Sequence, residues 1–226
     1  MDDYYRTVGT YEIPPDPENG VPDLESPECM NLPLLSQHLA QLAEGQEISL
    51  PRFDFETRSS IPDARTLRLD PDEVVLIEGI HSFNPVIMGD LAHAATGVYL
   101  SVASAVVPEE GARLEPYMLR FLRRAMRDSL FRNSPFEDTL HQWNSVRRGE
   151  RLYIAPYRGQ ANLTVDTFLP YELCILMQHL TLRLQQNAQE LAAADLAPLG
   201  AVLGQVAPID YADFLPEDSV LHEFIG

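Results

Sequence analysis

A short, continuous apolar run places the strongest constraint on the fold of this chain. Val74-Val75-Leu76-Ile77 is followed at once by Glu78 and Gly79. The run is too short for a helix and does not alternate with polar residues, which is typical of a strand buried on both faces of a parallel sheet. The segment Val98–Val102 shows the same pattern. Both segments are therefore predicted to be parallel strands of one sheet, with Glu78 near its C-terminal edge.

Helical and extended patterns alternate along the rest of the chain. Apolar residues at helical spacing predict helices over Asn31–Glu44, around residues 119–130, over Pro170–Gln186 and over Gln189–Gln205. Short strands are predicted at Glu47–Leu50 and Thr66–Leu69, on either side of a polar segment, and a last strand at Leu163–Asp166. Strands that alternate with helices indicate an α/β fold.

The charge of the chain is strongly negative and its basic residues are all of one kind. The formal net charge is -18, and all 16 basic residues are arginines. This balance argues against nucleic acid or an anionic membrane as the main partner, because both require a broad cationic face. The apolar runs are too short to cross a membrane, and the expected location is the cytoplasm.

The absence of lysine excludes several kinds of chemistry within these 226 residues. A Schiff base, a catalytic lysine and a phosphate-loop lysine all need that side chain. No G-x-x-x-x-G-K-[ST] string is present either. The arginines gather between residues 120 and 158, and such a stripe has two readings: a phosphate-binding helix face, or an ordinary solvated face.

A few polar residues stand where a site would be expected. In open α/β sheets ligands bind at the C-terminal ends of the strands, which is where Glu78 is predicted to lie, with His81 nearby as a possible donor. Near the start of the chain, Asp2 is followed by Tyr4 and Tyr5. A carboxylate beside an aromatic ring suits a hydroxyl-bearing substrate, because the carboxylate can orient the hydroxyl or accept its proton.

Five strings, taken in order, resemble the uridine kinase and phosphoribulokinase family. They are Asp2 to Arg6, the segment Leu50-Pro51-Arg52-Phe53-Asp54-Phe55, the run from Val74 to His81, the helix segment Arg123-Arg124-Ala125-Met126-Arg127-Asp128, and Ser145 to Glu150. The match is closest to the kinase domain of bacterial nucleoside kinases that carry a TGS-type N-terminal region, and it extends over essentially the whole chain.

The resemblance implies a set of roles. Asp2, Glu78, Arg124 and Arg127 would be catalytic, with Glu78 also the magnesium ligand. Tyr5, Phe53, Arg58, His81 and Arg120 would contact the substrate, and Arg123, Arg124, Arg127 and Arg132 would face the phosphates. ATP and Mg2+ are the implied cofactors. The family's histidine after the aromatic segment is replaced here by Arg58.

The fold implied by the resemblance is a parallel sheet of the P-loop kinase type with flanking helices, whose first strand and phosphate-binding loop are missing. Residues 1–187 would form the incomplete kinase-like domain, and residues 188–226 a helical C-terminal extension. Three readings remain open. The first is an ATP-dependent nucleoside kinase, which we expect to be inactive as the isolated chain. The second is a non-catalytic remnant or split subunit that acts as a binding or interaction module, and the third is an acidic protein without a ligand, whose arginine cluster would be mere surface. The expected partners are a nucleoside, ATP, an upstream P-loop segment or subunit, and a second copy of the chain.

Overall fold

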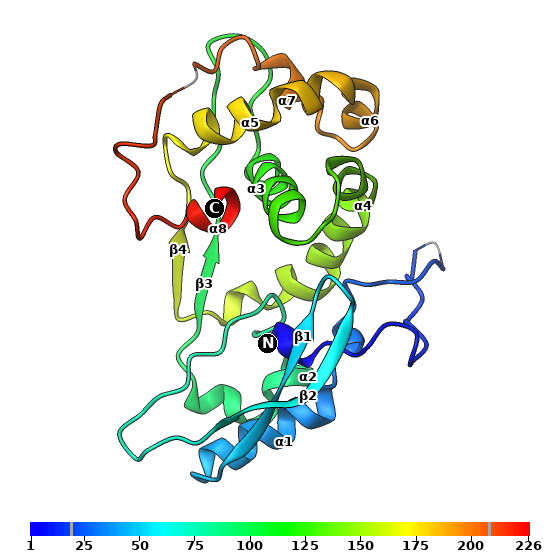
Figure 1. Ribbon diagram of the computed structural model, residues 1–226, viewed down its shortest axis with the longest axis vertical. Helices are drawn as coiled ribbons and strands as arrows, with labels where there is room; N and C mark the ends of the chain where they lie inside the picture. The colour runs from blue at the N-terminus through cyan, green and yellow to red at the C-terminus, as the bar shows by residue number, and fades with distance from the viewer. Residues whose placement is uncertain (19, 208) are drawn as a thin grey trace. The chain divides into compact units, whose positions relative to one another are not determined.

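A computed structural model describes residues 1–18, 20–207 and 209–226, with the side chains of residues 90–92 left undescribed. The chain forms two compact units (Figure 1). The first comprises residues 1–97 and 145–163, and the second comprises residues 98–144 and 164–226. The predicted boundary after residue 187 is a separate division and stays a prediction.

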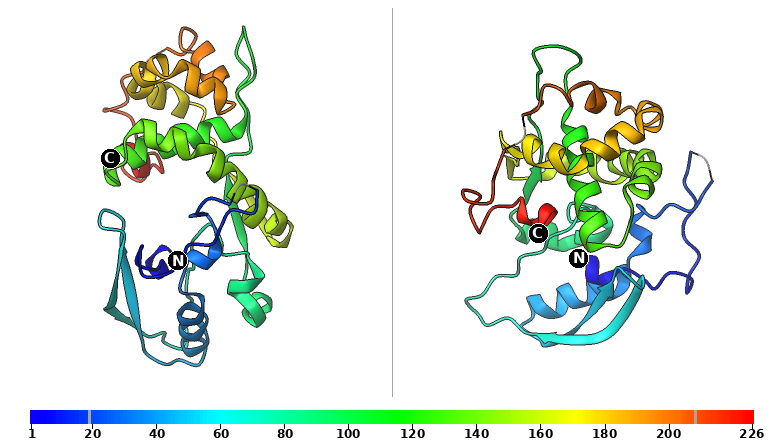
Figure 2. Two further views of the ribbon diagram at one scale, coloured as in Figure 1. Left: turned by 90° about the vertical axis from the view of Figure 1, so that its right-hand side faces the viewer. Right: turned by 45° about the horizontal axis from the view of Figure 1, so that its top comes forward.

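The first unit contains one long helix, one hairpin and several short helical turns. Its elements are η1 (Asp2–Tyr4), η2 (Pro27–Cys29), α1 (Leu32–Ala43), β1 (Ile48–Asp54), β2 (Ser59–Leu67), α2 (Pro85–Met88), η3 (Gly89–Ala94), the end of α4 (Phe136–Gly149), η4 (Glu150–Ile154) and η5 (Ala155–Gln160). The hairpin lies beside α1 in Figures 1 and 2. Its core is formed where Leu35, Leu39 and Leu42 of α1 pack with Ile48 and Leu50 of β1.

The predicted helix at Asn31–Glu44 is confirmed as α1. Asn31 is its N-cap, and its side-chain oxygen accepts a hydrogen bond from the N–H of Leu34 at 3.3 Å. Such a cap satisfies one of the N–H groups that have no partner inside the helix. Gly45, just beyond the C-cap, has a φ of 71°, a left-handed conformation that glycine adopts without steric cost.

The hairpin is longer than the predicted strands at Glu47–Leu50 and Thr66–Leu69. β1 and β2 are antiparallel, with Ile48 opposite Leu67 and Asp54 opposite Ser59. The side chain of Asp54 accepts hydrogen bonds from two N–H groups of the turn, those of Glu56 and Thr57. This turn lets polar residues form β2, a largely exposed strand that an apolar pattern does not signal.

The prediction of a strand at Val74–Ile77 is wrong in the structure. These residues lie in the coil between β2 and α2 (Figure 1). A strand exists only when a second backbone pairs with it, and no other segment of the described chain pairs with this one. The expected single parallel sheet is likewise absent from the described residues, which contain two separate two-stranded sheets.

The second predicted strand is confirmed as β3 (Val98–Ser101), which pairs with β4 (Leu163–Asp166). The N–H of Leu163 donates to the carbonyl of Gly97, and the N–H of Thr167 donates to that of Ser101. Both hydrogen bonds advance in the same direction along the two strands, so the pair is parallel, as the arrows in Figure 1 indicate. The α/β character of the chain is therefore confirmed, although the sheets are small.

The second unit is mainly helical. Besides β3, β4 and the start of α4, it contains α3 (Pro116–Phe131), α5 (Glu172–Gln186), α6 (Ala188–Ala193), α7 (Ala197–Ala201) and α8 (His222–Ile225). The ring of Phe121 in α3 packs edge-on against those of Phe136 and Trp143 in α4, at centroid distances of 5.5 and 5.3 Å. No helix in the described parts of the chain is long and apolar enough to span a membrane.

The single helix predicted over Gln189–Gln205 is wrong, because the segment forms two short helices. Asp195, between α6 and α7, has a φ of 60°, which no helix residue adopts. Pro198 lies in the first turn of α7, where its missing N–H is not needed. The helices predicted around residues 119–130 and over Pro170–Gln186 are confirmed as α3 and α5.

Candidate functional site

The first residues of the chain are held between α1 and the hairpin. The N–H of Asn31 donates to the carbonyl of Tyr4 at 2.7 Å, and Tyr5 forms an isolated bridge with Met30. Tyr4 is buried, and its hydroxyl lies 2.9 Å from Nδ1 of His38. Burial, aided by the nearby charge of Asp3, raises the pKa of Tyr4 to about 12. Tyr4 therefore anchors this segment as a neutral side chain.

Three aromatic rings gather where this segment meets the hairpin. The ring centroid of Tyr5 lies 5.6 Å from that of Phe53 and 6.5 Å from that of Phe55, and the two phenylalanines lie 5.1 Å apart. The N–H of Phe53 also donates to Oδ1 of Asp3 at 3.2 Å. Two of the sequence strings, far apart along the chain, are thus brought together into one aromatic wall (Tyr5, Phe53 and Phe55).

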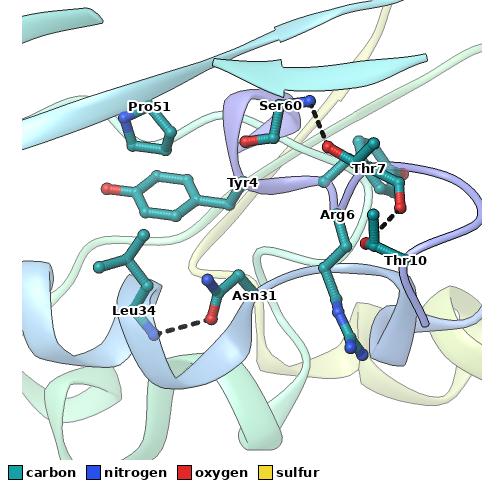
Figure 3. Close-up of a pocket in the computed structure, with 9 residues that line it drawn as sticks. Tyr4, Arg6, Thr7, Thr10, Asn31, Leu34, Pro51 and Ser60 are labelled. Carbon is teal, nitrogen blue, oxygen red and sulfur yellow. Dashed lines mark hydrogen bonds between the residues drawn. The ribbon is translucent and has the colours of Figure 1, made fainter. Parts of the chain in front are cut away.

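A pocket with a volume of about 220 Å³ adjoins this wall, because Tyr5 also lines the pocket. Figure 3 shows other residues that line it. The Thr7 hydroxyl accepts a hydrogen bond from the N–H of Ser60 at 2.9 Å, and the Thr10 hydroxyl donates to the carbonyl of Thr7 at 2.7 Å. The pocket is lined by Tyr4, Tyr5, Arg6, Thr7, Thr10, Asn31, Leu34, Pro51 and Ser60. Hydroxyl, amide and guanidinium groups next to aromatic rings can bind a small molecule that has both hydroxyl groups and a flat ring.

The sequence predicted only part of this pocket. Tyr5 lines it, whereas Asp2 does not, although Asp2 lies in the adjoining turn η1. Arg58 lies at the exposed turn of the hairpin with a φ of 52°, and its carbonyl accepts a hydrogen bond from the N–H of Val8. Sequence reasoning gave no site role to Arg6, although it belongs to the first string, or to Asn31, which it placed only at the start of a predicted helix.

Glu78 and His81 follow the apolar run but have very different environments. The Glu78 side chain is exposed, and its backbone carbonyl accepts a hydrogen bond from the amino group of Met1 at 2.8 Å. His81 is only 2% exposed, its ring lies 6.3 Å from that of Tyr153, and neither ring nitrogen makes a hydrogen bond of normal geometry with a described residue. Burial lowers the pKa of His81, although the Glu25 backbone and nearby carboxylates act in the opposite sense.

Arg123 does not lie on an exposed helix face as the arginine stripe predicted. Its Nε donates to Oε2 of Glu172 at 2.7 Å, and its Nη2 donates to the carbonyl of Thr167, also at 2.7 Å. The two charged side chains are 9% and 0% exposed. The apolar pattern did not reveal this pair because Glu172 lies on another helix, far along the chain.

The other arginines at the end of α3 surround a single carboxylate. Asp128 is buried and lies 3.2 Å from Arg124, 3.1 Å from Arg127 and 3.6 Å from Arg132. Three guanidinium groups surround this one carboxylate, on side chains that are roughly one-quarter exposed. This arginine cluster (Arg124, Arg127 and Arg132) can attract an anion. Arg120 lies one turn earlier on the same helix and is half-buried.

The arginines at positions 148 and 151 belong to the first unit and pair with acidic residues of that same unit. Arg148 forms a buried ion pair with Asp16, and Arg151 pairs with Glu18. The Tyr153 hydroxyl donates to Asp23 at 2.8 Å. Much of the positive charge between residues 147 and 153 is therefore balanced within the unit.

The predicted residues are divided between the two units. Asp2, Tyr5, Phe53, Arg58, Glu78 and His81 belong to the first, and Arg120, Arg123, Arg124, Arg127 and Arg132 belong to the second. Among the residues that the structure describes, no group of three or more His, Cys, Asp or Glu side chains is arranged to hold a metal ion. Glu78 by itself offers one exposed carboxylate.

Together, the fold and the pocket describe an α/β protein with a partly polar pocket next to three clustered aromatic rings. Comparison with known proteins adds a family resemblance over part of the chain. The sequence model described as Phosphoribulokinase / Uridine kinase family matches residues 15–110.

Several relatives are named uridine kinase. The one from Borrelia garinii subsp. bavariensis is 26% identical over 166 residues, which are 73% of this chain and 70% of that protein. The one from Borreliella burgdorferi is 27% identical with the same coverage, and the one from Shewanella amazonensis is 27% identical over 165 residues, which are 73% of this chain and 68% of that protein. The resemblance to uridine kinases read from the motifs is therefore confirmed by these relatives, which are 26–27% identical to this chain.

Proposed function

We propose that this protein binds a nucleoside and acts on the acceptor side of a uridine kinase-like phosphotransferase, in which ATP phosphorylates a nucleoside hydroxyl. The observation that carries the proposal is the aromatic wall of Tyr5, Phe53 and Phe55 beside a pocket lined by hydroxyl and amide groups. A base can stack on the rings, and a ribose can form hydrogen bonds with the polar lining.

Within this proposal, each predicted residue has a role. Asp2 accepts the proton of the attacking hydroxyl, while Tyr5 and Phe53 hold the base. Arg58, His81 and Arg120 are further substrate contacts; His81 would first have to become accessible, because it is buried. The arginine cluster would neutralise the phosphates, whereas Arg123 is committed to Glu172 and would support the cluster only indirectly.

The residues present fit ATP and Mg2+ only in part. The arginine cluster supplies positive charge, and Glu78 can supply one carboxylate to a magnesium ion whose other ligands would be phosphate and water. A phosphate loop surrounds the phosphates with several N–H groups and a lysine, and these 226 residues contain neither lysine nor the corresponding string. We therefore expect phosphoryl transfer to require a phosphate loop from polypeptide outside this sequence.

The lack of lysine also favours a second function, a nucleoside-binding module without phosphoryl transfer. The two functions share the pocket and differ in the response to ATP. Supplying a separate polypeptide that carries a glycine-rich G-K-[ST] loop distinguishes them. Uridine-dependent ATP consumption would support the kinase, and unchanged nucleoside binding without turnover would support the module.

Titration calorimetry with uridine and, separately, with magnesium ATP tests the binding step. Uridine is expected to bind, and Phe53→Ala to weaken binding at least about fivefold, since an aromatic–base stack contributes roughly 1–3 kcal/mol. Phe214→Ala is the matched control, because Phe214 is exposed and lies in the second unit. Equal uridine affinity of the wild type and a folded Phe53→Ala variant would refute the pocket assignment. Sub-millimolar binding of magnesium ATP at physiological salt would refute the need for an outside phosphate loop.

A further inference from the structure

The apolar run at residues 74–77 has the side-chain alternation of a β-strand although it pairs with nothing. Val74 and Leu76 are each 91% exposed, whereas Val75 is 40% exposed and Ile77 packs against the core of the first unit. Alternation with a period of two is the geometry of an extended strand. Ile77 at the end of the run therefore rests on the core, while Val74 and Leu76 present two large aliphatic side chains to solvent.

The backbone of this run is also unused. Among the described residues, none donates a hydrogen bond to, or accepts one from, the N–H and C=O groups of residues 74–77. The hydrogen bonds resume at the flanks, where Glu73 N–H donates to the carbonyl of Asp70 and the Glu78 carbonyl accepts from Met1. An exposed aliphatic segment with free backbone groups can act as a template for a strand of another chain.

The charges beside the run determine which strand fits. Asp72 and Glu73 precede it, and Glu78 follows it. If a second copy of this chain paired antiparallel so that all four apolar residues matched, Glu73 of each copy would lie opposite Glu78 of the other. Like charges directly opposite each other in a sheet are destabilising. Lysine or arginine at these places in the incoming strand would instead form cross-strand ion pairs.

We propose that residues 74–77 form a docking edge for an apolar β-strand of another polypeptide, flanked on both sides by basic residues. The incoming strand would form backbone hydrogen bonds along the free edge, and its side chains would cover Val74 and Leu76. This inference does not depend on nucleoside binding, because the docking edge shares no residue with the pocket.

Fluorescence anisotropy with two synthetic peptides tests the proposal on the unaltered protein. One fluorescein-labelled peptide, KRVVIVRK, has basic flanks, and the other, EDVVIVDE, has the same apolar centre and acidic flanks. The basic peptide is expected to bind at least about tenfold more tightly, and less tightly as salt rises. Absence of saturable binding by the basic peptide, or equal binding of both peptides, would overturn the proposal.

Two variants locate the binding site. Leu76→Asp is expected to weaken binding of the basic peptide at least about tenfold, whereas Leu182→Asp, at an exposed leucine of the second unit, leaves it unchanged. The double variant Glu73→Arg/Glu78→Arg is expected to reverse the preference toward the acidic peptide. Equal effects of Leu76→Asp and Leu182→Asp would refute the site. A dimer in light scattering that Leu76→Asp dissolves would assign the docking edge to a second copy and overturn the basic partner.

Discussion

Replacing Arg123 by alanine is expected to destabilise the second unit far more than replacing a neighbouring arginine. Arg123 in α3 and Glu172 in α5 form a charge pair at 2.7 Å, with both side chains shielded from water. After the substitution, the Glu172 carboxylate would stay buried with the N–H of Leu169 as its remaining hydrogen-bond donor in the described structure. A buried carboxylate without its cation is energetically unfavourable.

The expected magnitude follows from this burial. Removing one partner of a buried ion pair costs about 3–5 kcal/mol. Arg124→Ala is the comparison, because Arg124 is 24% exposed and the carboxylate it contacts retains Arg127 and Arg132. A partly exposed pair of this kind contributes only about 0–1 kcal/mol. The two substitutions on one helix should therefore differ by at least about 2 kcal/mol in the free energy of unfolding.

Urea unfolding monitored by tryptophan fluorescence measures this difference. Trp143 is the only tryptophan in the sequence and is buried in the second unit, so its signal reports on the unit that contains the pair. The double variant Arg123→Met/Glu172→Leu removes both charges and should recover most of the stability. An Arg123→Ala protein within about 1 kcal/mol of the wild type would refute a structural role for the pair.

Two further predictions concern the first unit. Burial lowers the pKa of His81 below its ordinary value of 6.5. As the pH falls, His81 is therefore protonated in the unfolded chain before it is protonated in the folded one. The stability that neutral His81 contributes is present above pH 6.5 and is lost as the pH falls below that value. His81→Asn should flatten the pH dependence of thermal unfolding between about pH 7 and pH 5, and an unchanged slope would contradict this reasoning. Gly149→Ala should lower the free energy of unfolding, measured with denaturant, by about 1–3 kcal/mol. The added Cβ would lie 2.4 Å from Cβ of Glu25. This clash outweighs the better helix propensity of alanine. Gly159→Ala, which meets no atom within 4 Å, is the control, and equal stability of the two variants would exclude the clash.

Much of the helical structure could be predicted because its signals are local. The leucine spacing and the Asn31 cap of α1 lie within one short segment, and the same holds for the apolar stripe of α3. The break between α6 and α7 was missed because the composition favoured a continuous helix, while the conformation of Asp195 interrupts it. The hairpin was underestimated since its exposed polar residues carry no core-facing pattern.

The candidate site was predicted as residues and not as an arrangement. The motifs singled out Tyr5 and Phe53, but their contact and the pocket beside them depend on the hairpin folding back toward the start of the chain. Arg6, which also lines the pocket, belongs to the first of the five strings, but the motifs indicated no role for it there. Position along a helix likewise could not show that Arg123 is buried against Glu172 while Arg124 is partly exposed.

The sequence by itself determined the resemblance to uridine kinases, most helix positions and the absence of a lysine-based phosphate loop from these residues, since each depends on residue identity or on neighbours within a few turns. Only the tertiary structure decided which strands pair, which arginines are buried and which side chains line the pocket. The run at residues 74–77 illustrates the difference. Its composition and alternation are properties of the segment, but a strand needs a second backbone, and the described fold does not provide one.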